Sequence, residues 1–120
     1  MAQRIFVYGT LKRGLSNSHY LSGQSFIGEA RTEPCYRMVD AGGYPGMYRV
    51  EESGLSIKGE IWEVDEVCRE KLDVLEDVAA GLYAVEPIPL LAPYDDAPVN
   101  TYLYRWSIMG RLDAGDCWRE

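Results

Sequence analysis

Residues 5–14, Ile-Phe-Val-Tyr-Gly-Thr-Leu-Lys-Arg-Gly, form the stretch that decides the fold of this chain. β-Branched and aromatic residues up to Tyr8, followed abruptly by Gly9, predict a buried first strand that ends in a tight loop. Gly9 has no Cβ, so a ligand can approach the backbone amides of Thr10 and Leu11 closely. Such a loop can bind an anion or a developing oxyanion, although an ordinary turn after a core strand has the same pattern.

The composition is that of an ordinary globular protein, with 47% hydrophobic and 26% charged residues. The length predicts a single domain over residues 1–120. No apolar run is long enough to cross a bilayer and the N-terminus lacks a secretory pattern, so we expect a cytoplasmic protein without a membrane partner. The net charge of −7 argues against nucleic acid as a partner. Lys12 and Arg13 form a local basic spot that either steers a carboxylate-bearing substrate or is simply solvated.

The three cysteines, Cys35, Cys68 and Cys117, are far apart and form no Cys-x-x-Cys pair, which argues against a disulfide framework or a structural zinc site. His19 is the only histidine, so a histidine-based metal site has almost no ligands available. The sequence leaves open a catalytic pair of Cys35 with His19, and a thiol hydrolase that uses Cys35 or Cys68.

The rest of the chain predicts five to seven short strands and one main helix. Strands are expected at 24–31, 35–40, 47–50, 55–64, 82–92 and 99–106, with turns at 41–46 and 93–98. Polar residues at 15–23 predict one or two turns of helix. Asp65 is expected to cap a helix that runs to about Asp77, because its apolar positions repeat with helical spacing. The segment from Met109 onward is expected to pack loosely.

These elements predict an α+β fold. The short, mostly hairpin-like connections favour a strongly curled, mostly antiparallel sheet or a small irregular β-barrel.

Glu76 is the leading candidate for acid–base chemistry. It lies one turn beyond Leu72, on the edge of the apolar stripe, and at the helix C-terminus, where the macrodipole disfavours an anion. Burial and the dipole both raise a carboxylate pKa toward values useful in a general base. The alternative is a solvated Glu at a fraying helix end. Glu60, in the strand at 55–64, is the rival carboxylate, and its alternative role is to pair with a Lys or Arg across the sheet.

Two motifs carry a resemblance to a known family. The run Tyr8-Gly9-Thr10-Leu11, extended through Lys12-Arg13-Gly14, resembles the opening motif of the γ-glutamylcyclotransferase-like family, in its AIG2-like γ-glutamylamine cyclotransferase branch. The run Leu72-Asp73-Val74-Leu75-Glu76 resembles the family signature Leu-Asp-x-Phe/Leu-Glu, whose final Glu is the acid/base residue.

Later segments match in order, so the resemblance spans about residues 5–106. The matching segments are Tyr44-Pro45-Gly46, Gly59-Glu60-Ile61-Trp62, Gly81-Leu82-Tyr83 and Val99 to Tyr104. The family commonly has an Arg soon after the tyrosine that matches Tyr83, where this chain reads Ala84-Val85. This departure bears on the local support of the site and on substrate choice.

The resemblance implies a barrel-like sheet flanked by short helices, with a cavity at one end. It implies an enzyme that cyclises a γ-glutamyl amine or amide to 5-oxoproline and releases the free amine, with Glu76 as the catalytic residue. The residues expected to contact this small-molecule substrate are Tyr8, Gly9, Thr10, Leu11, Gly46, Tyr83 and Tyr104. No metal or organic cofactor is expected, because the nucleophile and the electrophile belong to one molecule.

Two questions stay open at this stage. A non-catalytic small-molecule binding module would use the same cavity without an ionisable Glu76. The sequence also does not choose among γ-glutamylamines, γ-glutamyl amino acids and a γ-glutamyl protecting group on a biosynthetic intermediate, and it leaves the oligomeric state undecided.

Overall fold

A computed structural model of the chain describes residues 2–120. Its elements in chain order are β1 (Gln3–Val7), the 3-10 helix η1 (Ser18–Leu21), β2 (Ser25–Arg31), β3 (Tyr36–Asp40), β4 (Pro45–Arg49), β5 (Lys58–Val64), α1 (Glu66–Leu75), β6 (Tyr83–Pro87) and β7 (Asn100–Tyr104). Within residues 2–120, no helix is long and apolar enough to span a membrane. The α+β class and the order of elements agree with the sequence-based prediction.

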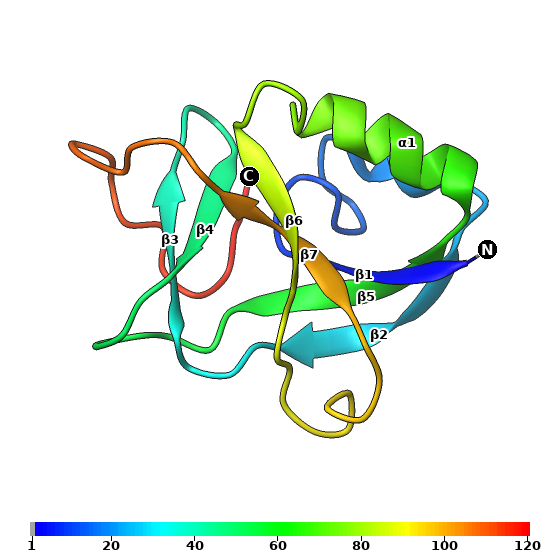
Figure 1. Cartoon of the computed structure of the whole chain (residues 1–120), viewed down its shortest axis with the longest axis horizontal. Helices are drawn as coiled ribbons and strands as arrows, with labels where there is room; N and C mark the ends of the chain where they lie inside the picture. The colour runs from blue at the N-terminus through cyan, green and yellow to red at the C-terminus, as the bar shows by residue number, and fades with distance from the viewer. Residues whose placement is uncertain (1) are drawn as a thin grey trace.

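Five strands form one mixed sheet in the order β2-β5-β1-β7-β6, while β3 and β4 form a separate hairpin (Figure 1). Strand β1 pairs antiparallel with β5 and parallel with β7, and the remaining pairs are antiparallel. The strand that opens the chain therefore lies in the middle of the sheet. Its apolar residues suit that place, because a central strand is covered on both faces.

The sheet is not closed into a barrel, which corrects the barrel expected from the sequence. The edge strands β2 and β6 do not pair with each other. Beyond their ends, only an isolated bridge between Thr32 and Leu90 joins the two segments. Pro87 and Pro89 lack the N–H groups that a second ladder along β6 would need, so the strand expected at 82–92 is cut short.

Apolar side chains are buried on both faces of the large sheet. Along β1, Ile5 and Val7 belong to one buried cluster and Phe6 to the other, as the alternation of a strand requires. Ile5 and Val7 share their cluster with Cys68 and Leu72 of α1. Helix α1 thus covers one face, and the hairpin β3–β4 packs at the other (Figure 1).

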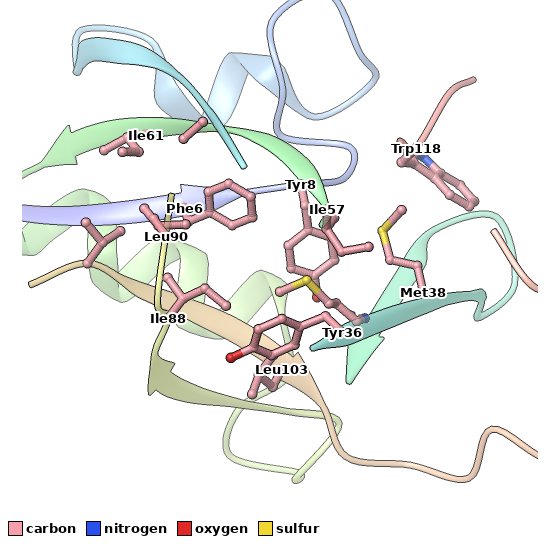
Figure 2. Packing of buried hydrophobic residues seen from close by; sticks show 13 residues of the cluster. Phe6, Tyr8, Tyr36, Met38, Ile57, Ile61, Ile88, Leu90, Leu103 and Trp118 are labelled. Carbon is pink, nitrogen blue, oxygen red and sulfur yellow. The ribbon is translucent and has the colours of Figure 1, made fainter. Parts of the chain in front are cut away.

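The C-terminal segment packs against the core from Ala114 to Trp118, which corrects in part the expectation of a loose tail from Met109 onward; residues 109–113 are exposed as expected. Met109 itself is exposed, but Trp118 belongs to the buried cluster that contains Met38 of β3 (Figure 2). The Ala114 N–H donates to the Met38 carbonyl at 2.9 Å. The segment after β7 therefore completes the cover over this face of the sheet.

Candidate active site

A cavity of about 250 Å³ lies where the loop after β1 faces the ends of α1 and β6. It is lined by Phe6, Val7, Tyr8, Gly9, Thr10, Leu11, Asn17, Tyr44, Pro45, Leu75, Glu76, Asp77, Leu82, Tyr83 and Tyr102. Six of the eight residues predicted to form the site are among them: Tyr8, Gly9, Thr10, Leu11, Glu76 and Tyr83. The fold therefore brings the glycine loop and the helix end to one place.

The loop after β1 forms one wall of this cavity. A Cβ at Gly9 would lie 2.6 Å from the Pro45 side chain, so only glycine permits this close approach. Asn17 closes the loop, because its N–H donates to the Thr10 carbonyl and its Nδ2 donates to Thr10 Oγ1, both at 2.9 Å. Within residues 2–120, the amides of Thr10 and Leu11 have no acceptor. They are available to a ligand.

Glu76 is placed at the cavity by the way α1 ends. The backbone at Asp77 has a φ of 55°, in the left-handed region. The Asp77 N–H donates to the Val74 carbonyl and the Val78 N–H to the Asp73 carbonyl, both at 3.1 Å. This pair of bonds is a Schellman motif, which stops the helix and turns the chain. Glu76 is the C-cap, so its side chain leaves the helix beside the cavity.

The Glu76 carboxylate has an unusual environment. It is partly buried, and within residues 2–120 no group donates a hydrogen bond to it or pairs with it. Burial raises the pKa of Glu76 from 4.5 to about 7, because the charged form is poorly solvated there. A carboxyl group with this pKa can both accept and return a proton near neutral pH.

Two tyrosines of the cavity wall are fixed by hydrogen bonds to the backbone. The Tyr8 hydroxyl donates to the Tyr102 carbonyl at 2.5 Å and accepts from the Met47 N–H at 3.3 Å. The Tyr83 hydroxyl donates to the Pro45 carbonyl. Burial raises the pKa of both hydroxyls, so they stay protonated. They shape the wall and hold strand β4 against β6 and β7.

Gly46 and Tyr104, expected to contact the substrate, are not among the residues that line the cavity. A Cβ at Gly46 would lie 2.5 Å from Cγ of Tyr104, so this glycine lets the aromatic ring pack directly on β4. The Tyr104 ring also meets the Tyr83 ring edge-on, with centroids 5.5 Å apart. Both residues support the cavity wall through packing.

Other lining residues were not anticipated from the sequence. They are Asn17, Tyr44, Asp77 and Tyr102, together with apolar neighbours. The one available signal was the alternation along β7, because Tyr102 lies two residues before Tyr104 and on the same face. That alternation gives the face of a strand but not the position along it that reaches a cavity.

Glu60, the rival carboxylate, pairs with an arginine, which is the alternative role considered for it in the sequence. Its side chain is buried, and its Oε1 accepts from the Arg13 N–H at 3.0 Å and from Trp62 Nε1 at 3.1 Å. Its Oε2 accepts from Arg13 Nε at 3.2 Å. Lys12 is also engaged, with Nζ donating to the Trp118 carbonyl at 2.9 Å. Neither cation lines the 250 Å³ cavity.

The cysteine alternatives find no support in the cavity. Cys35 and Cys68 are free thiols, and neither lines it. Burial raises the pKa of the Cys68 thiol, which makes it a weaker nucleophile. Within the described part of the chain, no group of three or more His, Cys, Asp or Glu side chains could hold a metal ion.

Comparison with known proteins supplies the family. A profile described as gamma-glutamyl cyclotransferase, AIG2-like, matches residues 5–120. A protein of Vibrio cholerae serotype O1, provisionally named a gamma-glutamylcyclotransferase, is 36% identical over 116 residues, which cover 97% of this chain and 96% of that protein. Gamma-glutamylaminecyclotransferase A of Danio rerio is 44% identical over 80 residues, 61% of this chain and 50% of that protein.

The crystal structure of an AIG2-like protein from Mus musculus has a TM-score of 0.71 at 31% identity and covers 85% of this chain and 76% of that chain. The crystal structure of c4763, a uropathogenic E. coli-specific protein, has a TM-score of 0.80 at 29% identity and covers 94% of this chain and 87% of that chain. Sequence and structure thus point to one family over nearly the whole length. The chain belongs to the AIG2-like family of γ-glutamyl cyclotransferases and is a cyclotransferase enzyme.

Proposed function

We propose that this enzyme cyclises a γ-glutamyl amine or amide to 5-oxoproline and releases the free amine, with Glu76 as general base and general acid. The observation that carries the proposal is the carboxyl group of Glu76, whose pKa is raised to about 7 in the cavity that Thr10 and Leu11 also line. Family membership supplies the class of reaction, and the cavity supports the roles of the residues.

Glu76 would accept a proton from the substrate's α-amino nitrogen, whose lone pair then attacks the γ-carbonyl carbon. One N–C bond forms and closes a five-membered ring. When the tetrahedral intermediate collapses, the original amide C–N bond breaks and protonated Glu76 returns its proton to the departing nitrogen. Each proton taken from one nitrogen is delivered to the other, so the reaction consumes no water.

The amides of Thr10 and Leu11 would bind the oxyanion or the substrate's α-carboxylate. They suit either role because they have no acceptor within residues 2–120 and belong to a loop fixed by Asn17. Preorganised donors of this kind contribute about 10²–10³-fold to the rate. General acid–base catalysis contributes about 10²–10⁴-fold, and holding the glutamyl chain in a cyclic conformation supplies much of the remainder.

The charge of the cavity favours an amine as the leaving group. Two carboxylates, Glu76 and Asp77, line it, and no lysine or arginine does so within the described residues. A γ-glutamyl amino acid releases a group that carries its own carboxylate, which these two acids would repel. A γ-glutamyl amine releases a neutral or cationic group. The volume of about 250 Å³ also limits the buried part of the substrate to amino-acid size.

Incubation in H₂¹⁸O with a γ-glutamylamine, or separately with a γ-glutamyl α-amino acid, tests this function. Cyclisation predicts 5-oxoproline and free amine in equal amounts by NMR and mass spectrometry, without ¹⁸O in the product, and faster turnover of the amine substrate. Glutamate that carries ¹⁸O would show hydrolysis instead. Binding of either substrate without any product would favour a non-catalytic module and contradict the proposal.

A further inference from the structure

The C-terminal segment, residues 116–120, meets the loop that lines the cavity. Figure 1 shows the red end of the chain returning beside the blue segment that follows β1. Lys12 Nζ donates to the Trp118 carbonyl at 2.9 Å and lies 3.7 Å from Cys117 Sγ. These contacts join residues more than a hundred positions apart.

The Lys12 contact is an unusual one. Lys12 as a whole residue is only 9% exposed, and within residues 2–120 its ammonium group has no carboxylate partner. A buried ammonium must find acceptors, because it has lost most of its hydration. The Trp118 carbonyl supplies one from a fixed position, since the Trp118 side chain is packed in the core beside Met38 (Figure 2). The packing of the Trp118 side chain thus fixes the position of its carbonyl oxygen, and the hydrogen bond to that oxygen fixes the Lys12 ammonium group.

A second contact holds the far side of the same loop. The Glu120 carboxylate accepts from the Ser16 N–H at 2.8 Å and from Ser16 Oγ at 2.5 Å. This pair is exposed, so we expect it to contribute less than the Lys12 contact. Between the two contacts, Arg13 is bound to Glu60 of β5. The segment from Lys12 to Ser16 is therefore bound both to strand β5 of the sheet and to the C-terminal segment.

The held segment is continuous with the cavity wall. The Lys12 N–H donates to the Gly9 carbonyl at 3.1 Å, which closes a turn whose two central residues are Thr10 and Leu11. Asn17, directly after Ser16, donates to Thr10 through both its backbone and its side chain. A displacement at Lys12 or Ser16 would therefore move the two free amides.

We propose that Lys12 and the C-terminal residues Trp118 and Glu120 are positioning residues, which hold the Thr10 and Leu11 amides at the cavity. The inference rests on the proposed function insofar as those amides act on the substrate. The C-terminal segment does not itself line the cavity. Its contacts support the loop after β1, which does.

The variant Lys12→Met tests the main contact, because it keeps the apolar stem and removes the three donors. Glu120→Gln tests the exposed contact in a position where folding is not at risk. The matched controls are Lys71→Met and Glu52→Gln, at exposed positions that do not line the cavity. For each, kcat and KM are measured across pH, and hydrogen exchange is followed at the amides of residues 9–17.

For Lys12→Met we expect kcat/KM to fall about 10–100-fold, since small misplacements of a catalytic group have effects of this size. The acidic limb near pH 7 should not move, because Glu76 is untouched. Exchange in residues 9–17 should accelerate by about tenfold as the loop opens more often. Glu120→Gln should show the same changes to a smaller extent, and the controls none.

A lowered Tm with unchanged kcat, KM and loop exchange would assign Lys12 a purely structural role and overturn the inference. The exchange measurement also separates this inference from the proposed function. If the unmodified enzyme turns over no γ-glutamyl substrate, the proposed function fails, and faster loop exchange in Lys12→Met would still support the positioning contact.

Discussion

The hydroxyl of Tyr83 donates to the carbonyl of Pro45 and not to Glu76, although Tyr83 and Glu76 line the same cavity. Because this donor is occupied elsewhere, the Glu76 carboxylate gains no hydrogen bond from Tyr83 that would stabilise its charge. Burial therefore acts unopposed and raises the pKa of Glu76 to about 7. The arrangement keeps the carboxyl group near the pH at which it can exchange protons.

Replacement of Tyr83 by Phe separates the structural role of this tyrosine from a catalytic one. The change leaves the Pro45 carbonyl without its donor, so we expect a loss of about 1–2 kcal/mol in the free energy of unfolding by urea. We expect kcat at saturating substrate to stay within about threefold, because the hydroxyl is not free to act on substrate. A loss of more than a hundredfold in kcat would show that Tyr83 takes part in the chemistry.

The raised pKa of Glu76 predicts a pH-dependent difference in stability. The folded pKa of about 7 lies above the ordinary 4.5, so the neutral form stabilises the fold below pH 4.5 and this stabilisation is lost as the pH rises through 7. Glu76→Gln is neutral throughout. Its free energy of unfolding relative to the unmodified protein should therefore rise between pH 4.5 and 8 by on the order of 2–3 kcal/mol.

Urea unfolding at pH 5 and pH 8 measures this difference, with the exposed Glu52→Gln as a control that should show none. An equal offset for Glu76→Gln at both pH values would mean that the pKa of Glu76 is ordinary.

Asp77 occupies a position that favours glycine. Its φ of 55° lies in the left-handed region, where a side chain is disfavoured and glycine is not. Asp77→Gly should therefore raise the free energy of unfolding by about 0.5–1 kcal/mol. Asp77→Ala retains a Cβ and should bring no gain. Thermal unfolding of both variants measures the effect, and a lower Tm for Asp77→Gly than for Asp77→Ala would contradict the account of the helix end.

Glu60 provides the contrast to Glu76. Glu60→Gln weakens the contacts to Arg13 and Trp62, and we expect it to lower the free energy of unfolding by about 1–3 kcal/mol. The remaining folded enzyme should keep the acidic limb of kcat/KM near pH 7, because Glu60 does not line the cavity. Disappearance of that limb in Glu60→Gln would mean that Glu60, and not Glu76, is the acid–base residue.

The features that the sequence predicted well are those decided by residues near one another in the chain. The Asp65 side chain accepts from the Cys68 N–H at 2.8 Å, as expected of a cap that acts within one turn. Cys68 and Leu72 are buried on the face that their spacing indicated. Glu76 could be singled out for the same reason, since its place at the edge of the stripe and at the helix end follows from local spacing.

The features that could not be predicted depend on contacts between distant parts of the chain. Trp118 is anchored against Met38, and its carbonyl binds Lys12; no local pattern around Trp118 shows either contact. The prediction of a closed barrel was wrong because closure requires β2 and β6 to pair, and this depends on how long both edge strands are. The choice between Tyr102 and Tyr104 as cavity residues depends on where β7 crosses the loop after β1.

The central claim is that Glu76 moves the proton, and the most direct measurement is kcat/KM for Glu76→Gln at pH 7.5 on the best γ-glutamylamine substrate. Glutamine has nearly the same shape but cannot accept the proton, so we predict a loss of about 10²–10⁴-fold in a folded protein that still binds substrate. Turnover at the rate of the unmodified enzyme would contradict the account.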